Sequence, residues 1–203
     1  MEVKYFKKIA GQKCYLSPMS VDDAEKYTEW LNDFSVTVTL NTVDTILSVD
    51  KERDELKALA RGYNFSIIDS KTNKVIGSGG FFNVDLVNKN AEFGLFIGDK
   101  TFWNRGYGTE ASQLLLDFGF NVLNLYHVSL KVFDFNHRAI KCYEKVGFQN
   151  VGKFTEIREI AGKRYDMYFM EILAKNFTSP YIKKAFDELQ HEKLEVGLKV
   201  DLI

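Results

Sequence analysis

Proline and cysteine are both scarce in this chain. Its 203 residues include two prolines and two cysteines. So few prolines argue against long stiff linkers and proline-rich disordered segments. The cysteines, Cys14 and Cys142, lie far apart and form no paired motif. A disulfide framework is therefore not expected, and a reducing cytoplasm is the default location.

Net charge and long apolar runs are also lacking. The formal net charge is −1, so no whole-chain field attracts nucleic acid or an anionic membrane, and neither is expected as a partner. The apolar stretches are interrupted by charged residues, and no apolar signal-peptide core follows Met1. Three scattered histidines, His127, His137 and His191, lack metal-ligand spacing. We therefore predict no membrane span and no metal site.

Hydrophobic residues, in contrast, make up 45% of the chain, enough for a sizeable core. In the first half, helical spacing predicts helices over 21–32 and 49–61. Alternation predicts strands over 13–18, 64–68, 75–85 and 91–97, and residues 33–48 are expected to form a loop or a short strand. Short turns join the last three strands, which indicates antiparallel neighbours.

In the second half of the chain, from Tyr107, the spacing of the apolar residues changes from alternation to the helical repeat. A helix of about four turns is predicted from Tyr107, then a strand over 128–133, a helix from Asn136 to Gly147, strands over 149–160 and 164–172, and a helix over 180–189. This order predicts an α+β fold with a mixed, mostly antiparallel central sheet flanked by helices. The length suits one domain, over residues 1–174, followed by a helical extension over residues 175–203.

Two glycines separated by one residue, Gly106 and Gly108, join a strand to a helix. Such a loop can direct several backbone N–H groups at one anion, and Arg105 adds a positive charge. A tight structural turn explains the glycine pair equally well. Residues 106–111 also fit the dinucleotide fingerprint G-x-G-x-x-G/A. However, antiparallel strands and a long loop precede them, which is the wrong context for that fold.

Two longer blocks of residues are more specific than the glycine pair alone. Residues 92–111 resemble motif A of the GNAT N-acetyltransferases, Q/R-x-x-G-x-G/A, and residues 136–148 resemble their motif B, N-x-x-A-x-x-x-Y-x-x-x-G-F. The resemblance covers roughly residues 12–174. Residues 158–170 are similar to the branch containing ribosomal-protein alanine and spermidine acetyltransferases. Trp103 stands at the family's Q/R position, so no side-chain role is transferred to it.

The resemblance implies a GNAT-like fold and acetyl transfer from acetyl-CoA to a primary amine, such as a protein N-terminus, a polyamine or another small amine. It also implies a set of cofactor contacts. The loop backbone would bind the CoA pyrophosphate, the end of the preceding strand would pair with the pantetheine arm, and the start of the later helix would complete the site. The residues are Phe96, Ile97, Gly98, Trp103, Asn104, Arg105, Gly106, Tyr107, Gly108, Thr109, Asn136, Ala139 and Tyr143.

For catalysis, the resemblance implies Tyr143 as the general acid that protonates the departing thiolate. Packing in the core is the alternative for this tyrosine. Glu92 is the candidate general base, and a surface ion pair is its alternative. A non-catalytic module that binds acyl-CoA is the alternative function.

The acceptor cannot be read from the sequence. A polyamine needs a cluster of acids, which Glu29, Asp33, Glu156 and Glu159 supply only if folding brings them together. Tyr27 and Trp30 are expected in the core, or else in the wall of an acceptor pocket. A homodimer is a further possibility, because the charged tail could pack against a second copy.

Overall fold

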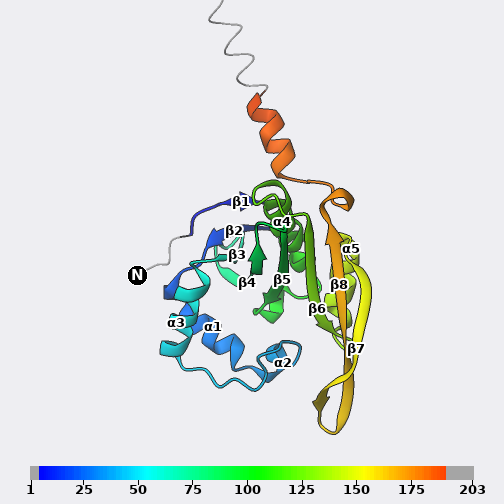
Figure 1. The fold of residues 1–203 in the computed structure, drawn as a ribbon. Helices are drawn as coiled ribbons and strands as arrows, with labels where there is room; N and C mark the ends of the chain where they lie inside the picture. The colour runs from blue at the N-terminus through cyan, green and yellow to red at the C-terminus, as the bar shows by residue number, and fades with distance from the viewer. Residues whose placement is uncertain (1–4, 191–203) are drawn as a thin grey trace, which may run out of the picture.

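The computed structural model describes residues 5–190, and an eight-stranded sheet forms its centre (Figure 1). The strand order is β1-β2-β3-β4-β5-β6-β8-β7, and all neighbours pair antiparallel except β5 and β6, which are parallel. The predicted α+β fold with a mixed, mostly antiparallel sheet is confirmed. The strands are β1 (Ile9–Ala10), β2 (Cys14–Pro18), β3 (Tyr63–Asp69), β4 (Val75–Asp85), β5 (Asn90–Ile97), β6 (His127–Phe133), β7 (Gln149–Ile160) and β8 (Lys163–Leu173).

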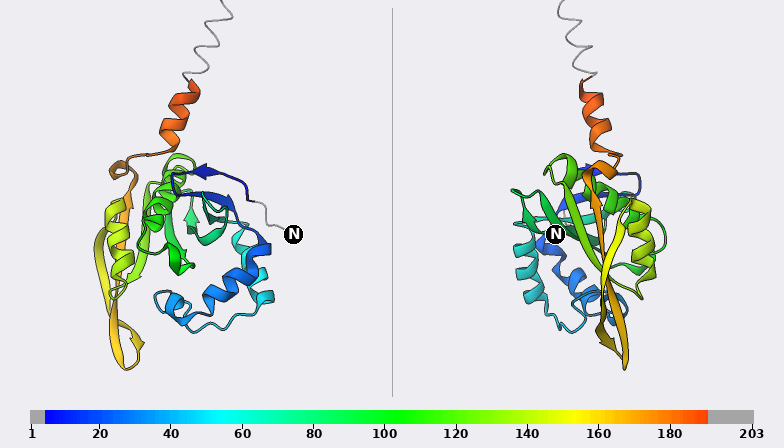
Figure 2. Two further views of the ribbon diagram at one scale, coloured as in Figure 1. Left: turned by 180° about the vertical axis from the view of Figure 1, so that it is seen from behind. Right: turned by 45° about the vertical axis from the view of Figure 1, so that its right-hand side comes forward.

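Helices cover both faces of the sheet (Figure 2). On one face, α4 and α5 pack over the larger hydrophobic core. On the other face, α1 and α3 pack over a smaller core that contains Tyr27 and Trp30, which confirms the expected core positions. The helices are α1 (Ala24–Leu31), α2 (Phe34–Thr37), α3 (Val49–Leu59), α4 (Tyr107–Asn121) and α5 (His137–Val146).

The predicted elements agree with the structure apart from the region before α3. Residues 33–48 contain the short helix α2, where a loop or short strand was expected. Asp33 starts this helix, because its side chain accepts a hydrogen bond from the N–H of Ser35 at 2.9 Å. The first predicted helix opens with a 3₁₀ turn over Val21–Asp23. The two-residue strand β1 was not predicted.

The C-terminal segment is attached to α4 by a buried carboxylate. Asp117 is fully buried, and its Oδ2 atom accepts hydrogen bonds from the N–H groups of Tyr181 at 2.8 Å and Ile182 at 3.0 Å. Residues 182–190 are helical and project away from the body of the molecule (Figures 1 and 2). The predicted extension over 175–203 remains a prediction, because residues 191–203, which include His191, lie outside the described residues, as does Met1.

One irregularity of the sheet positions the site. The parallel pairing of β5 and β6 spans three residue pairs and ends at Glu92 opposite Ser129. Beyond this point β5 continues along β4 to Ile97, while β6 continues along β8 to Phe133. The two strands therefore diverge, and a gap opens in the middle of the sheet.

Candidate active site

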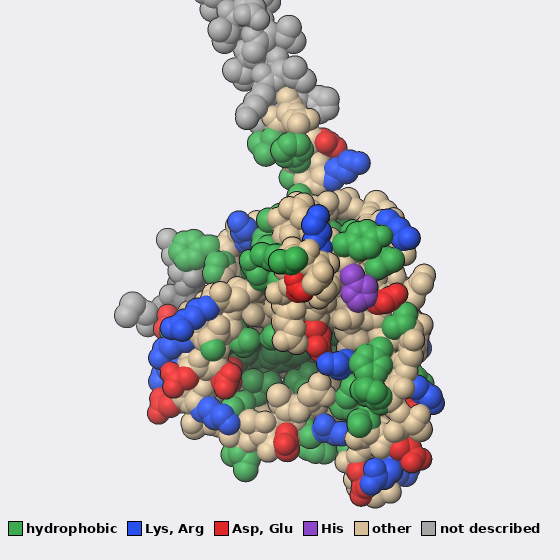
Figure 3. All heavy atoms as spheres, viewed as in Figure 1, with side chains coloured by type: hydrophobic (Ala, Val, Ile, Leu, Met, Phe, Trp, Pro, Cys, Tyr) green, Lys and Arg blue, Asp and Glu red, His purple; other side chains and the backbone are tan. Residues whose placement is uncertain are grey.

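A cavity of about 540 Å³ lies where β5 and β6 diverge. Its walls come from β5, β6, the start of α4, α5 and residues 36–41. The face drawn in Figure 3 is visibly hollowed here, with hydrophobic side chains around the hollow. Most of the predicted site residues line this one cavity, namely Glu92, Phe96, Ile97, Trp103, Asn104, Gly106, Tyr107, Gly108, Thr109, Asn136, Ala139 and Tyr143.

Two predicted cofactor residues, Gly98 and Arg105, are not on the cavity wall. The N–H of Gly98 donates to the carbonyl of Ile76 at 2.9 Å, so the sheet already uses it. A Cβ on Gly98 would lie 2.2 Å from the Trp30 ring, which covers this position. The guanidinium of Arg105 turns away and donates to the carbonyl of Thr101 at 3.1 Å. Arg105 can therefore contribute its backbone N–H to the loop, but its side-chain charge does not line the cavity.

The backbone between β5 and α4 is shaped for an anion. Asn104 and Gly106 both have positive φ, 58° and 84°, so the chain turns sharply before α4 begins at Tyr107. The first N–H groups of an α-helix have no carbonyl partner within the helix. Here they are at the cavity wall, with the positive end of the helix dipole behind them. This arrangement suits a phosphate group.

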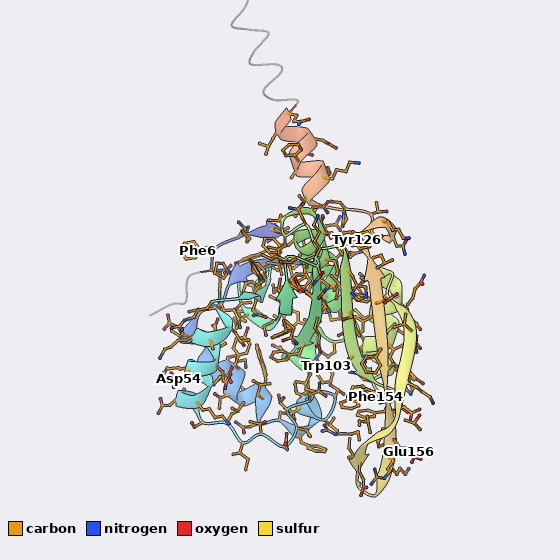
Figure 4. All side chains as sticks on the ribbon, viewed as in Figure 1. Phe6, Asp54, Trp103, Tyr126, Phe154 and Glu156 are labelled. Carbon is orange, nitrogen blue, oxygen red and sulfur yellow. The ribbon has the colours of Figure 1, made fainter. Side chains whose placement is uncertain are left out.

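The side chain of Trp103 packs back against the end of β5 (Figure 4). Its indole N–H donates to the carbonyl of Ile97 at 2.7 Å. The guanidinium of Arg138 stacks 3.5 Å from the centre of the indole ring, on the first turn of α5. Burial lowers the pKa of Arg138 from its value of 12.5, and the group stays cationic at neutral pH. Trp103 thus fixes a positive charge beside the loop, a role the sequence did not reveal.

Basic residues of α5 are the main feature that sequence reasoning missed. Arg138, Lys141 and Lys145 all line the cavity. Their spacing of three and four residues places them on one face of the helix. That spacing was the available signal, because Ala139 and Tyr143 occupy the apolar face of the same segment. The cavity therefore has a cationic side next to the N-terminus of α4.

Tyr143 reaches the cavity from α5 and is only 7% exposed. Its ring contacts Phe93 and Phe148, with ring centroids 6.1 and 5.7 Å apart. Burial raises the pKa of the Tyr143 phenol above its ordinary value of 10, and the neighbouring Cys142 adds to this effect. Within residues 5–190 the hydroxyl has no hydrogen-bond partner. A protonated phenol is therefore available at the cavity wall.

Glu92 reaches the cavity from the opposite face of the sheet. Phe93 packs on Tyr143, so the alternation of a strand directs Glu92 to the other side, where Phe96 packs on Trp30. Both carboxylate oxygens of Glu92 accept hydrogen bonds from Lys131 Nζ, each at 3.1 Å. Lys131 lies on β6 and was not predicted from the sequence. The ion pair spans the gap between the diverging strands.

The family model described as "Acetyltransferase (GNAT) domain" matches residues 13–149. The chain belongs to the GNAT acetyltransferase family. An "Uncharacterized N-acetyltransferase p20" from Bacillus licheniformis is 30% identical to this GNAT protein over 183 residues, which cover 87% of this chain and 99% of that protein. A spermidine N(1)-acetyltransferase from Escherichia coli (strain K12) is 39% identical over 70 residues, 34% of this chain and 37% of that protein.

Solved structures share the fold of this GNAT protein. The spermidine N-acetyltransferase of Vibrio cholerae, determined in complex with CoA and spermine, superposes with a TM-score of 0.73 at 21% identity. The match covers 82% of this chain and 98% of that one. Together with the family model, these relatives identify the chain as an acetyl-CoA-dependent N-acetyltransferase. The family does not favour a non-catalytic acyl-CoA-binding module.

The cavity fits the cofactor of the family. Acetyl-CoA carries an anionic pyrophosphate and a long neutral pantetheine arm. Free N–H groups at the start of α4, together with the cations of α5, match the anionic part. The unpaired edge of β5 after Glu92 matches the arm, because it offers backbone donors and acceptors beside apolar side chains. In the described part of the chain, no group of three or more metal-ligating side chains occurs, and no helix is long and apolar enough to cross a membrane.

Proposed function

We propose that this enzyme transfers the acetyl group directly from acetyl-CoA to a primary amine, which is a protein N-terminus, a polyamine or another small amine. One observation carries the proposal: a single cavity reaches both faces of the sheet. Tyr143 enters it from the face of α5, and Glu92 enters it from the face of α1. Two substrates can therefore meet in the gap between β5 and β6.

The cofactor is held by backbone groups more than by side chains. The N–H groups of residues 105–109 bind the pyrophosphate, with Arg138 as the nearest fixed cation. Acetyl-CoA supplies the acetyl group as an activated thioester. Asn136 caps α5, since its Oδ1 accepts the N–H of Ala139 at 3.2 Å, and its amide NH₂ is left to bind the arm. Phe96 and Ile97, at the end of β5, line the part of the cavity that holds the pantetheine arm. The rest of the cofactor site is lined by Trp103, Asn104, Gly106, Tyr107, Gly108, Thr109 and Ala139.

Tyr143 acts as the general acid. Its raised pKa keeps the phenol protonated at neutral pH, so it starts each turnover in the donating state. The same burial makes the phenol a weaker acid than a thiol, whose pKa is about 8.5. The tyrosinate therefore regains a proton before the next cycle. The phenol acts only while the carbon–sulfur bond is breaking, when negative charge develops on sulfur.

Glu92 acts as the general base on the acceptor side. The amine loses a proton as its nitrogen bonds to the acetyl carbon, and a carboxylate at the wall can accept that proton. Lys131 holds the carboxylate in position through two hydrogen bonds of 3.1 Å. Charge is balanced in this scheme, because Glu92 gains the proton that the amine loses, and the departing sulfur takes one from Tyr143.

Cys142 supports direct transfer over a covalent acetyl-enzyme. Its thiol lies 3.5 Å from Thr109 Oγ1, and burial raises its pKa, so the reactive thiolate is disfavoured. Cys14 is also a free thiol, and it is fully buried. The two free thiols suit a reducing cytoplasm, which we propose as the location.

The proposal is tested with Tyr143→Phe, using Tyr15→Phe as the control because Tyr15 is buried outside the cavity. Removing a general acid should lower kcat by roughly 10²–10⁴-fold, while calorimetry shows acetyl-CoA affinity within about twofold of wild type. The control should change neither quantity. A loss of affinity that matches the loss of rate would refute the acid role. Acetyl-CoA binding without turnover in the wild type would refute the enzymatic proposal.

A further inference from the structure

The charges on the cavity wall indicate which amine the site accepts. Glu92 is the one acid among the described residues that line the cavity. Lys131 neutralises it at 3.1 Å, and both side chains are partly exposed, 39% for Lys131 and 29% for Glu92. The other charged lining residues are the cations of α5, which face the start of α4. The acceptor side therefore carries one ion pair and no excess negative charge.

The acids considered for a polyamine site lie elsewhere. None of Glu29, Asp33, Glu156 and Glu159 lines the cavity. Three of them are paired with cations: Glu29 with Lys26 at 2.8 Å, Asp33 with Lys100 at 2.6 Å, and Glu159 with Arg164 at 2.8 Å. A polyamine brings two or more positive charges, and here it would meet Lys131 without a second acid to offset the repulsion. The cavity is poorly matched to such a substrate.

The remaining acceptor wall is apolar or neutral. Residues 36–41 contribute Val36 and Leu40, together with the neutral polar residues Thr39 and Asn41. The sheet contributes Phe82, Phe133 and Met167. Phe82 lies over Gly94, where a Cβ would come within 2.8 Å of the ring, so glycine allows the ring to approach β5 closely. An apolar group of moderate size fits these surroundings.

We propose that the acceptor is an amino carboxylate with an apolar side chain, in which one carboxylate lies next to the reacting amine. The ammonium group binds Glu92, and the carboxylate binds Lys131. One ammonium proton leaves to solvent before attack, and Glu92 takes the second as the neutral amine bonds to the acetyl carbon. Each partner of the internal ion pair exchanges its protein neighbour for a ligand group of the same charge, so no charge is left unpaired. The inference rests on the proposed function, because Glu92 must face the amine that is acetylated.

The test compares three acceptors at saturating acetyl-CoA: leucine, leucinamide and spermidine. Leucinamide has the amine and the side chain but lacks the carboxylate, as a peptide N-terminus does. Leucine should have the highest kcat/KM, exceeding leucinamide by roughly tenfold or more, because a charge-assisted hydrogen bond is lost in the amide. Lys131→Met should lower kcat/KM for leucine by the same factor. For leucinamide the loss should be smaller, because the amide has no carboxylate for Lys131 to bind and loses only the positioning of Glu92.

Lys153→Met is the matched control. Lys153 pairs with the carboxylate of Asp166 at 2.5 Å on the β7–β8 hairpin, outside the cavity. This variant should leave the ratio of leucine to leucinamide at its wild-type value. Two results would overturn the acceptor assignment and leave amine acetylation standing. One is a higher kcat/KM for spermidine or leucinamide than for leucine. The other is an equal loss of kcat/KM for leucine and leucinamide in Lys131→Met. Transfer to none of the three amines would overturn both proposals.

Discussion

Replacing Gly108 with alanine should separate cofactor binding from folding. Gly108 lies in the first turn of α4, and it has no positive φ that would require glycine. A Cβ there would meet Cys142 Sγ at 3.6 Å and Leu95 Cδ2 at 3.9 Å, which are ordinary van der Waals distances. The fold therefore has room for the methyl group. Since alanine is a better helix former than glycine, Gly108→Ala should stabilise the protein by about 0.5–1 kcal/mol.

The effect on binding should have the opposite sign. Gly108 also lines the cavity, at the turn where the N–H groups of α4 face the proposed pyrophosphate site. A methyl group there would keep the phosphate away from one or two of these donors. A hydrogen bond to a charged group contributes about 1.5–3 kcal/mol, so the dissociation constant should rise roughly tenfold to a hundredfold. Calorimetric titration with acetyl-CoA measures the binding, and thermal unfolding should show Tm raised by about 1–4 °C.

Gly162→Ala is the control for the cost of glycine replacement. Gly162 has φ 77° in the turn between β7 and β8, and a Cβ there would meet no atom within 4 Å. Alanine in this left-handed conformation should cost about 1–2 kcal/mol of stability without changing acetyl-CoA affinity. Unchanged affinity in Gly108→Ala would refute the assignment of this turn to the pyrophosphate. A drop in Tm together with the loss of affinity would show that the substitution had disturbed α4 itself.

Two further substitutions probe buried carboxylates outside the cavity. Asp117→Ala removes the acceptor for the N–H groups of Tyr181 and Ile182, so it should lower the free energy of unfolding by about 2–4 kcal/mol. Urea unfolding measures the loss, and limited proteolysis should cut the C-terminal segment first; unchanged protease resistance would argue against this attachment. In Glu52, burial raises the pKa from 4.5 to about 7, so the folded protein keeps a proton that the unfolded chain releases between these pH values. Stability should therefore fall as pH rises through this window, and Glu52→Gln should exceed wild type by up to roughly 3 kcal/mol above pH 7 and match it below pH 4.5. Equal urea midpoints for both proteins at pH 8 would contradict the perturbed carboxyl.

The strands and long helices could be predicted from the sequence because their signals are local. Alternation and turn residues identified β3, β4 and β5, and the apolar period identified α4. The helix α2 could not be found in this way, because four residues are too few to show a helical repeat of apolar positions. Its start depends on the side chain of Asp33, which is a signal of a turn as much as of a helix.

The site could be predicted only as far as its motifs extend. The motifs placed Tyr143 and the loop before α4 in one cavity with Glu92. The position of Gly98 depends on the register between β4 and β5, which assigns its N–H to Ile76 and not to the cavity. Contacts between side chains far apart in the sequence could not be predicted either. Lys131 meets Glu92 only because β6 runs parallel to β5, and these residues are 39 positions apart in the sequence.

The divergence of β5 and β6 explains why this site can bring two substrates together. A continuous sheet separates its two faces, because neighbouring strands lie less than about 5 Å apart and their backbone groups pair. Here the pairing stops at Glu92, and the residues that follow on β5 have an open edge. The cofactor can use that edge for its backbone bonds. The acceptor can reach the same point from the face of α1. Pairing β5 with β6 along their whole length would keep every side chain named here and still prevent the reaction proposed above, since Tyr143 and Glu92 would then be separated by the sheet.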